Sequence, residues 1–277
     1  MEPNAMQMEQ LKKIELVIFR EFIDICEKLN LKYYVLGGTL LGAVRHNGFI
    51  PWDDDIDVGM PRKDYETFLK EAPALLNEHY FLQNHVTDPN WVSNFSKIRD
   101  SRTTFIESSV KKFSINHGVY IDIFPLDYHD KANEESFFRK FRRYTRRIGL
   151  SYWTPGIKQK IKKCLLSFIP LLCCPSLKKT VLKRENLMKR NGETPYMANY
   201  CGAWGRKEII PAAWYGDGVV LNFEGMNVNA PSDYDAWLTQ VYGEYMKLPP
   251  EEKRKPHHYT EIVDLDKSYK NYSEGML

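Results

Sequence analysis

The stretch from Tyr34 to Met60 contains the residue types best suited to chemistry. Four carboxylates lie within five positions near its end, beside apolar residues: Asp53, Asp54, Asp55 and Asp57. Like charges at this spacing repel one another, and removing them from water raises the cost further. We therefore expect a cation among them, and a set of hard carboxylate oxygens favours Mg²⁺ or Mn²⁺.

Asp55 and Asp57 alternate with apolar residues in "DIDVGM", so both side chains would share one face of an extended strand. Asp122, flanked by isoleucines in "VYIDIF", is a candidate third ligand or base on a later strand. Taken alone, the pattern also fits a solvated strand end. In that reading Asp53 and Asp54 are loop charges, and Asp122 pairs with an arginine.

A glycine pair adds a second signal. Gly37 and Gly38 lie between the expected strand "KYYVL" and a helix that reaches about His46, and Thr39 can cap that helix. Backbone N–H groups at such a turn and helix start bind phosphate. A tight turn would explain a glycine pair by itself. Here, however, the pair precedes the candidate metal site by one helix, and the combination suits a metal-bound phosphate ester.

The stretch "GGTLLGAVRHNGFIPWDDDIDVGM" resembles the signature of the LicD family of phosphotransferases, which includes bacterial phosphocholine transferases and fukutin-related proteins. The resemblance resumes in "SKIRDSRT", "YIDIFPLD" and "YGEYMKLPPEEKRKPHH". It implies an α+β class and the nucleotidyltransferase (DNA polymerase β-like) fold, a mixed β-sheet flanked by helices, with a basic helical insertion. We expect a catalytic core over 1–135, the insertion over 136–195, and a C-terminal region over 196–277 that completes the active site.

The resemblance also implies roles for particular residues. Asp55, Asp57 and Asp122 would hold the divalent metal and act in catalysis. Asp53 and Asp54 would then orient or tune Asp55 and Asp57 without binding the metal themselves. The donor phosphates would be bound by the glycine turn and by basic residues: Gly37, Gly38, Thr39, Arg45, Lys97, Arg99, His257 and His258. An ordinary structural role fits each basic residue about equally well.

Members of this family take a phosphorylated alcohol from a CDP-linked donor, such as CDP-choline or CDP-ribitol, and release CMP. The resemblance therefore implies metal-dependent transfer, of phosphocholine first, to a hydroxyl of a cell-surface glycan such as teichoic acid or lipopolysaccharide. Two alternatives stay open. One is transfer of an NMP from an NTP with release of pyrophosphate, and the other is a non-catalytic glycan- or membrane-binding module.

A bound choline would favour an aromatic wall. The candidate residues for such a wall are Trp91, Trp153, Trp204, Trp214 and Tyr215. Packing in the core and at turns is the stronger explanation for aromatic residues beside glycines.

Periodicity places these residues among mixed helices and strands. Apolar residues at steps of three and four predict a helix from Leu11 to Leu29. Pro61 opens a second helix that reaches Leu76, and 231–248 is predicted to be a third. The segments "YFLQNH", "NFSKIRD", "TTFIES" and "GVYIDIF" are predicted strands.

Composition and the basic middle of the chain bear on location. With 277 residues and a net charge of +3, a nucleic-acid partner is not expected. The five cysteines lack zinc spacing, the N-terminus lacks a signal-peptide pattern, and the longest apolar run is too short to span a bilayer, so we expect a cytoplasmic protein. Segment 139–174 joins a cationic stripe to this apolar run. It fits peripheral contact with the inner face of the cell membrane and a lipid-linked glycan acceptor, or equally a solvated helix followed by a buried one.

Overall fold

The computed structural model describes residues 4–152, 176–256 and 258–272, and its centre is a curled, mixed β-sheet. The sheet has the strand order β1-β2-β6-β4-β3, with β7 paired to the end of β6 and β8 paired to β7. These strands are β1 (Tyr34–Val35), β2 (Asp57–Pro61), β3 (Tyr80–Gln83), β4 (Ser96–Asp100), β6 (Val119–Tyr128), β7 (Tyr196–Ala198) and β8 (Ile209–Pro211). Strands β2 and β6 run parallel, and the other pairs are antiparallel.

Two smaller sheets accompany the main one. Strand β5 (Thr104–Glu107) pairs with β11 (Thr260–Asp264), and β9 (Val219–Phe223) pairs with β10 (Met226–Ala230). The pairing of β5 with β11 brings the C-terminal segment beside Glu107 at the end of β5. Strands β7 and β8 also extend the main sheet from the C-terminal third of the chain. The main hydrophobic core includes residues from both ends of the chain, from Leu11 to Leu265.

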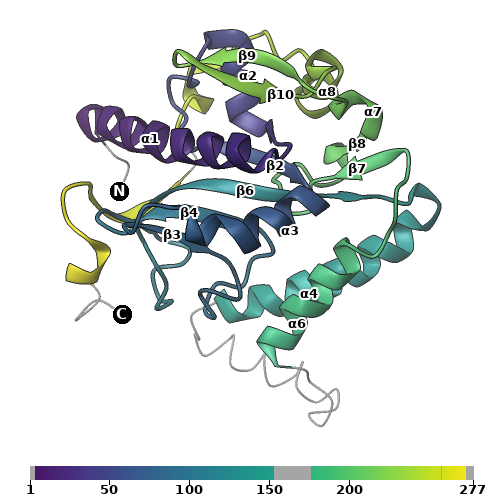
Figure 1. Cartoon of the computed structure of the whole chain (residues 1–277), viewed down its shortest axis with the longest axis horizontal. Coiled ribbons are helices and arrows are strands. Elements are labelled where there is room, and N and C mark those ends of the chain that lie inside the picture. Colours follow the sequence, from purple (N-terminus) through teal and green to yellow (C-terminus); the bar gives the residue numbers. More distant parts are fainter. Residues whose placement is uncertain (1–3, 153–175, 257, 273–277) are drawn as a thin grey trace.

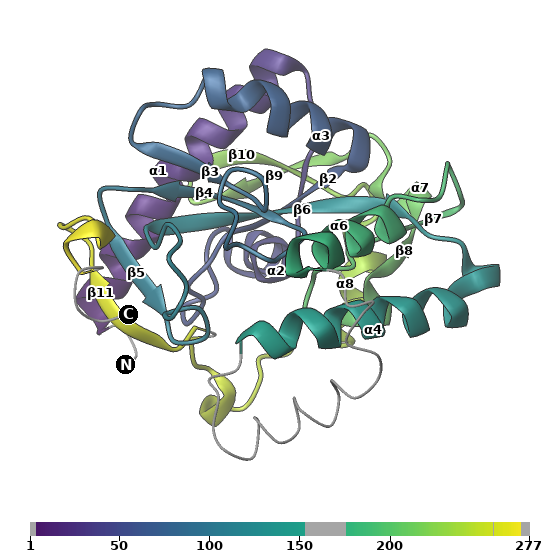
Figure 2. The ribbon, with the colours of Figure 1, turned by 90° about the horizontal axis from the view of Figure 1, so that it is seen from below.

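Helices cover both faces of the main sheet, as Figures 1 and 2 show. The helices are α1 (Ala5–Leu29), α2 (Gly37–His46), α3 (Arg62–Glu71), α4 (Glu134–Tyr152), α6 (Leu177–Met188), α7 (Ala212–Tyr215) and α8 (Tyr234–Tyr242). Helices α1 and α3 meet through Phe22 and Phe68, whose ring centroids lie 5.2 Å apart. Helices α4 and α6 lie side by side, on the other side of β6 from α1. The predicted α+β class, with a mixed sheet flanked by helices, is confirmed.

The alternation of side chains on β6 separates the core from the site. Ile121 and Ile123 are fully buried in the main core, together with residues of α1 and α3. Asp122 lies between them in sequence and therefore points to the opposite face of the sheet. On β2, Val58 and Met60 are fully buried, as the alternation in "DIDVGM" predicts.

Several predicted boundaries are wrong. The helix expected to reach Leu76 ends at Glu71, because Pro73 cannot continue it and a 3₁₀ turn follows. The helix expected over 231–248 spans only α8 and ends at Gly243, which has a positive φ of 74°. The strand expected to include Asp55 begins at Asp57, because its pairing with β6 begins there, opposite Asp122.

The predicted first helix is confirmed as α1, which ends at Asn30 in the left-handed conformation. Across the described ranges, no helix is both long and apolar enough to cross a membrane. Of the segment predicted to contact a membrane, residues 153–174 lie outside the described residues.

Candidate active site

Gly37 and Gly38 bring the start of α2 against two carboxylates. A β-carbon on Gly37 would lie 2.7 Å from Asp57 Oδ2, and one on Gly38 would lie 2.2 Å from Asp53 Oδ2. Gly37 also has a φ of +54°, which disfavours a larger residue. Any anion held by the backbone N–H groups of this turn would therefore lie beside the acidic cluster.

Thr39 contributes to this arrangement in a different way from the one predicted. The N-cap of α2 is Leu36, which makes no side-chain cap, so the prediction that Thr39 caps the helix is wrong. Instead, the Thr39 hydroxyl accepts a hydrogen bond of 2.8 Å from the backbone N–H of Asp57. This bond joins α2 to the first residue of β2 and so fixes the position of Asp57.

Three of the four clustered carboxylates converge. Asp53, Asp54 and Asp55 each place one oxygen within 4.8 Å of the other two. Burial, followed by the charges of Asp55 and Asp54, raises the pKa of Asp53 well above its usual range. Burial, followed by the charges of Asp55 and Asp122, does the same to the pKa of Asp57. A divalent cation would relieve this repulsion, so the oxygen-only donor set fits one.

Asp57, Asp122 and Lys97 form a row across three neighbouring strands. Asp57 of β2 is the register partner of Asp122 of β6, and Asp122 is the partner of Lys97 of β4. The Lys97 ammonium lies 2.8 Å from Asp122 Oδ1 and 3.2 Å from the centroid of the Tyr120 ring. Burial raises the pKa of Asp122, although Lys97 opposes the shift. The pairing partner of Asp122 is thus a lysine rather than the arginine considered from the sequence.

His258 connects the C-terminal segment to the cluster. Its Nδ1 lies 3.2 Å from Asp54 Oδ1, its backbone N–H donates to Asp54 Oδ2, and its Nε2 lies 3.9 Å from Glu107 Oε1. Burial alone would lower its pKa. The hydrogen bond to Asp54 and the charges of Asp55, Asp54 and Glu107 prevail and raise the pKa of His258 to about 9. The imidazole is therefore charged at neutral pH.

The other predicted basic residues are placed differently. Arg45 donates to the carbonyl of Tyr245 at 2.7 Å and so links α2 to the C-terminal region. Arg99 is fully buried and donates to Gln83 and to the carbonyl of Gly118. This placement favours a structural role for Arg99. His257 lies outside the described residues.

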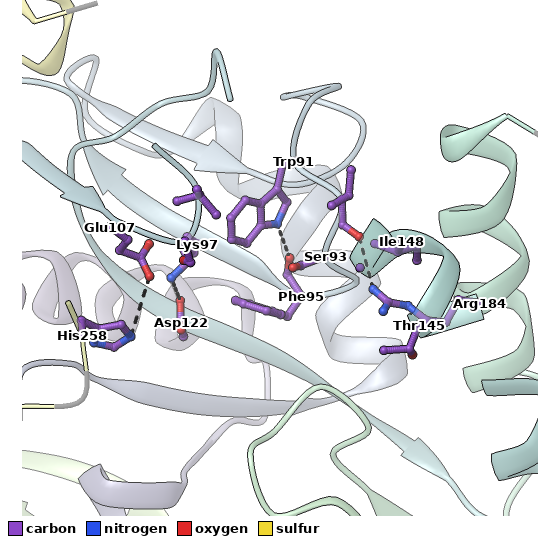
Figure 3. A pocket seen from close by; sticks show the side chains of 14 residues that line it. Trp91, Ser93, Phe95, Lys97, Glu107, Asp122, Thr145, Ile148, Arg184 and His258 are labelled. Atoms are coloured by element: carbon purple, nitrogen blue, oxygen red, sulfur yellow. Dashed lines mark hydrogen bonds and ion pairs between the residues drawn. The ribbon is translucent and has the colours of Figure 1, made fainter. Parts of the chain in front are cut away.

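A cavity of about 380 Å³ begins at this row of charges and extends toward α4 and α6 (Figure 3). Lys97, Asp122 and His258 line its inner end, and Ile148 and Arg184 line its outer end. The rings of Trp91 and Phe95 lie between the two ends. The cavity therefore connects the candidate catalytic residues with the packed pair of helices α4 and α6.

Sequence reasoning missed two acids near the site, Glu107 and Glu15. Glu107 ends the apolar strand "TTFIE", the same signal that singled out Asp122. Glu15 of α1 is 2% exposed, and its Oε2 has no hydrogen-bond partner among the described residues. Its position between Leu11 and Ile18, on the apolar face of the helix, could have indicated from the sequence that this acid is buried.

Of the proposed aromatic wall residues that the structure describes, Trp91 alone lines the cavity. Trp214 and Tyr215 pack in or against the main core, and Trp204 is 43% exposed beside Tyr242. Trp153 lies outside the described residues.

Comparison with known proteins gives a consistent result. The family model described as LicD/FKTN/FKRP, nucleotidyltransferase domain, matches residues 30–156. The chain is 30% identical to the lipopolysaccharide cholinephosphotransferase LicD of Haemophilus influenzae over 95% of its own length and 100% of that protein. It is 27% identical to the human ribitol 5-phosphate transferase FKRP over 36% of this chain and 20% of that protein. An uncharacterised protein of Rickettsia typhi is 36% identical over 30% of this chain and 25% of its own length.

Proposed function

Because the chain belongs to the LicD family, we propose that it is a phosphotransferase that modifies a cell-surface glycan. In the finer form of the proposal, it moves a phospho-alcohol, phosphocholine first, from a CDP-linked donor to a glycan hydroxyl and releases CMP. The donor is proposed from the family and from the relative that is a lipopolysaccharide cholinephosphotransferase. The observation that carries the chemistry is the close approach of Gly37 and Gly38 to the carboxylates of Asp57 and Asp53.

The proposed metal ligands are Asp55 and Asp57, with Asp122 beside them and with Asp53 close to Asp55. A bound Mg²⁺ or Mn²⁺ would neutralise phosphate charge and stabilise the leaving CMP. The rest of the proposal concerns the chain's own groups. The N–H groups of the glycine turn would bind the donor phosphates. The hydrogen bond from the backbone N–H of Asp57 to the Thr39 hydroxyl fixes the start of β2 next to this turn. Asp54 is bonded to His258 and so serves to hold the C-terminal segment in place.

Charge around Asp122 would assist the transfer. Burial raises the pKa of Asp122, which makes its carboxylate a better acceptor for the proton of an attacking hydroxyl. Lys97, 2.8 Å away, supplies a positive charge that can also compensate phosphate oxygens. The new bond joins the acceptor oxygen to phosphorus, the bond between phosphorus and the CMP oxygen breaks, and the proton moves to Asp122.

A membrane contact is proposed from the surface of α4 and α6. Their exposed basic residues are Arg139, Lys140, Arg142, Arg143, Arg146, Lys178, Lys179 and Lys183. The opposite side of α4 packs through Phe137 into a small hydrophobic cluster of its own. Such a basic surface fits an anionic leaflet, and it would place the enzyme near a lipid-linked glycan.

CMP release tests the proposal. The protein is incubated with CDP-choline and a panel of glycans, with Mg²⁺ or with EDTA. We expect metal-dependent CMP release that Asp57→Asn abolishes and that Asp217→Asn leaves unchanged, because the Asp217 side chain is 99% exposed on the surface. Release from CDP-ribitol or CDP-glycerol alone would reassign the donor. Pyrophosphate from an NTP would favour nucleotidyl transfer, and inactivity with every donor would favour a binding module.

A further inference from the structure

The cavity beside Asp122 extends away from the glycine turn of the proposed donor site. Neither the glycine pair nor the cluster Asp53–Asp55 lines it, whereas Asp122 and Lys97 do. Its volume of about 380 Å³ is within the usual range for small-molecule sites, which is roughly 300–1,000 Å³. The cavity can therefore hold a group of its own next to the reacting phosphorus.

The order of the strands indicates on which side of Asp122 a group bound in the cavity would lie. The glycine pair follows β1 and touches Asp57 of β2, and Asp122 and Lys97 follow on β6 and β4. Neighbouring strands are about 4.8 Å apart, so the row from Asp57 to Lys97 spans roughly 10 Å. The donor phosphates and the cavity thus lie on opposite sides of Asp122. In phosphoryl transfer, the attacking and leaving oxygens lie roughly in line on opposite sides of phosphorus.

The lining of the cavity indicates what it can bind. The Lys97 ammonium lies 5.6 Å from the Trp91 ring, 5.5 Å from the Phe95 ring and 3.2 Å from the Tyr120 ring. The ring faces that would attract a quaternary ammonium therefore already hold a cation, and a choline here would meet a like charge. The cavity also has hydroxyl groups: those of Ser93, Ser109 and Thr145. Together with the hydrogen-bonding groups of Glu107, Arg184 and His258, the rings and hydroxyls suit a hydroxylated ring.

We infer that this cavity is the acceptor subsite, and that it holds a sugar ring of the glycan with one hydroxyl directed toward Asp122. The inference rests on the proposed function. The sugar hydroxyl oxygen attacks phosphorus, its proton passes to Asp122, and the bond from phosphorus to the CMP oxygen breaks on the side of the glycine pair. The choline group of the donor lies outside this cavity.

Filling the outer part of the cavity tests the assignment. Ser109 and Thr145 are exposed residues that line it, so the double variant Ser109→Trp/Thr145→Trp adds bulk without disturbing the core. The control Asn186→Trp places the same bulk on an exposed position of α6 that does not line the cavity. CMP release from CDP-choline is measured in water alone and with deacylated lipopolysaccharide as the acceptor probe.

We expect the double variant to raise the KM for the acceptor at least tenfold. The KM for CDP-choline and the release of CMP to water should stay within twofold of wild type, and the control should match wild type throughout. An unchanged acceptor KM, or a parallel loss of donor binding, would overturn the acceptor assignment. If wild type released CMP to water but no glycan stimulated it, the acceptor assignment would also fall. Wild type that releases no CMP from any CDP-alcohol would instead refute the proposed function.

Discussion

His258 should make the stability of the metal-free protein depend on pH in a specific window. The imidazole is buried and bonded to Asp54, and the surrounding carboxylates raise its pKa to about 9 from 6.5. A group whose folded pKa is raised stabilises the fold fully below its unfolded pKa and loses that effect as pH rises through the folded pKa. Each pKa unit corresponds to about 1.4 kcal/mol, so the contribution below pH 6.5 is about 3 kcal/mol.

The perturbation is His258→Gln, which keeps an N–H donor but removes the titrating charge. At pH 6 the variant should be less stable than wild type by about 3 kcal/mol. The difference should shrink as pH rises and approach zero near pH 9.5. Saturating Mg²⁺ should reduce the difference at pH 6, because a cation bound at Asp55 and Asp57 offsets the charge of Asp55 that attracts the imidazolium.

Urea unfolding at several pH values between 6 and 9.5, in EDTA, measures this difference directly. His79→Gln is the matched control, because His79 immediately precedes β3 and has its ring against Tyr80. Its stability should run parallel to wild type across the range. A difference between wild type and His258→Gln that is constant with pH would refute the reasoning, because it would mean that the lost contact is not an ionic one.

Three further predictions concern other parts of the site. Gly38→Ala should lower CMP release at least tenfold, because its β-carbon would displace the Asp53 carboxylate, whereas Gly192→Ala, with open space around its β-carbon, should be active. Lys97→Met should destabilise the protein by roughly 3–5 kcal/mol at pH 7 in urea unfolding, because it leaves Asp122 buried and unpaired, and adding Asp122→Asn should recover most of that loss. The protein should sediment with vesicles that contain phosphatidylglycerol but not with pure phosphatidylcholine vesicles, and 0.5 M NaCl should release it if the α4 surface binds by charge.

Local sequence patterns predicted much of the fold. The steps of three and four in α1 and its end at Asn30 depend on neighbouring residues, so they could be identified without the structure. The same holds for the alternation that places Val58 in the core and for the strand that carries Asp122. Boundaries were less predictable where a distant partner decides them, and β2 begins at Asp57 because its pairing with Asp122 of β6 begins there.

The candidate site shows the same division. The glycine pair and the carboxylates could be identified because their types and spacing are local. The partners of these carboxylates could not be identified in this way. His258, which pairs with Asp54, also lies close to Glu107, and this proximity depends on the pairing of β5 with β11. The pairing of Lys97 with Asp122 likewise depends on β4 lying next to β6, which the sequence does not specify.

Three of the four clustered carboxylates are held by different parts of the chain, and this arrangement helps to explain how they can coexist. Asp53 lies against the glycine turn, Asp54 is bonded to His258, and Asp57 is fixed by Thr39. Because Asp54 is committed to the imidazolium of His258, that charge offsets part of the repulsion even before a cation binds. Burial, together with the remaining repulsion, raises the pKa values of Asp53 and Asp57. Cation binding should therefore be coupled to proton release from these residues, and its affinity should rise with pH until they are ionised.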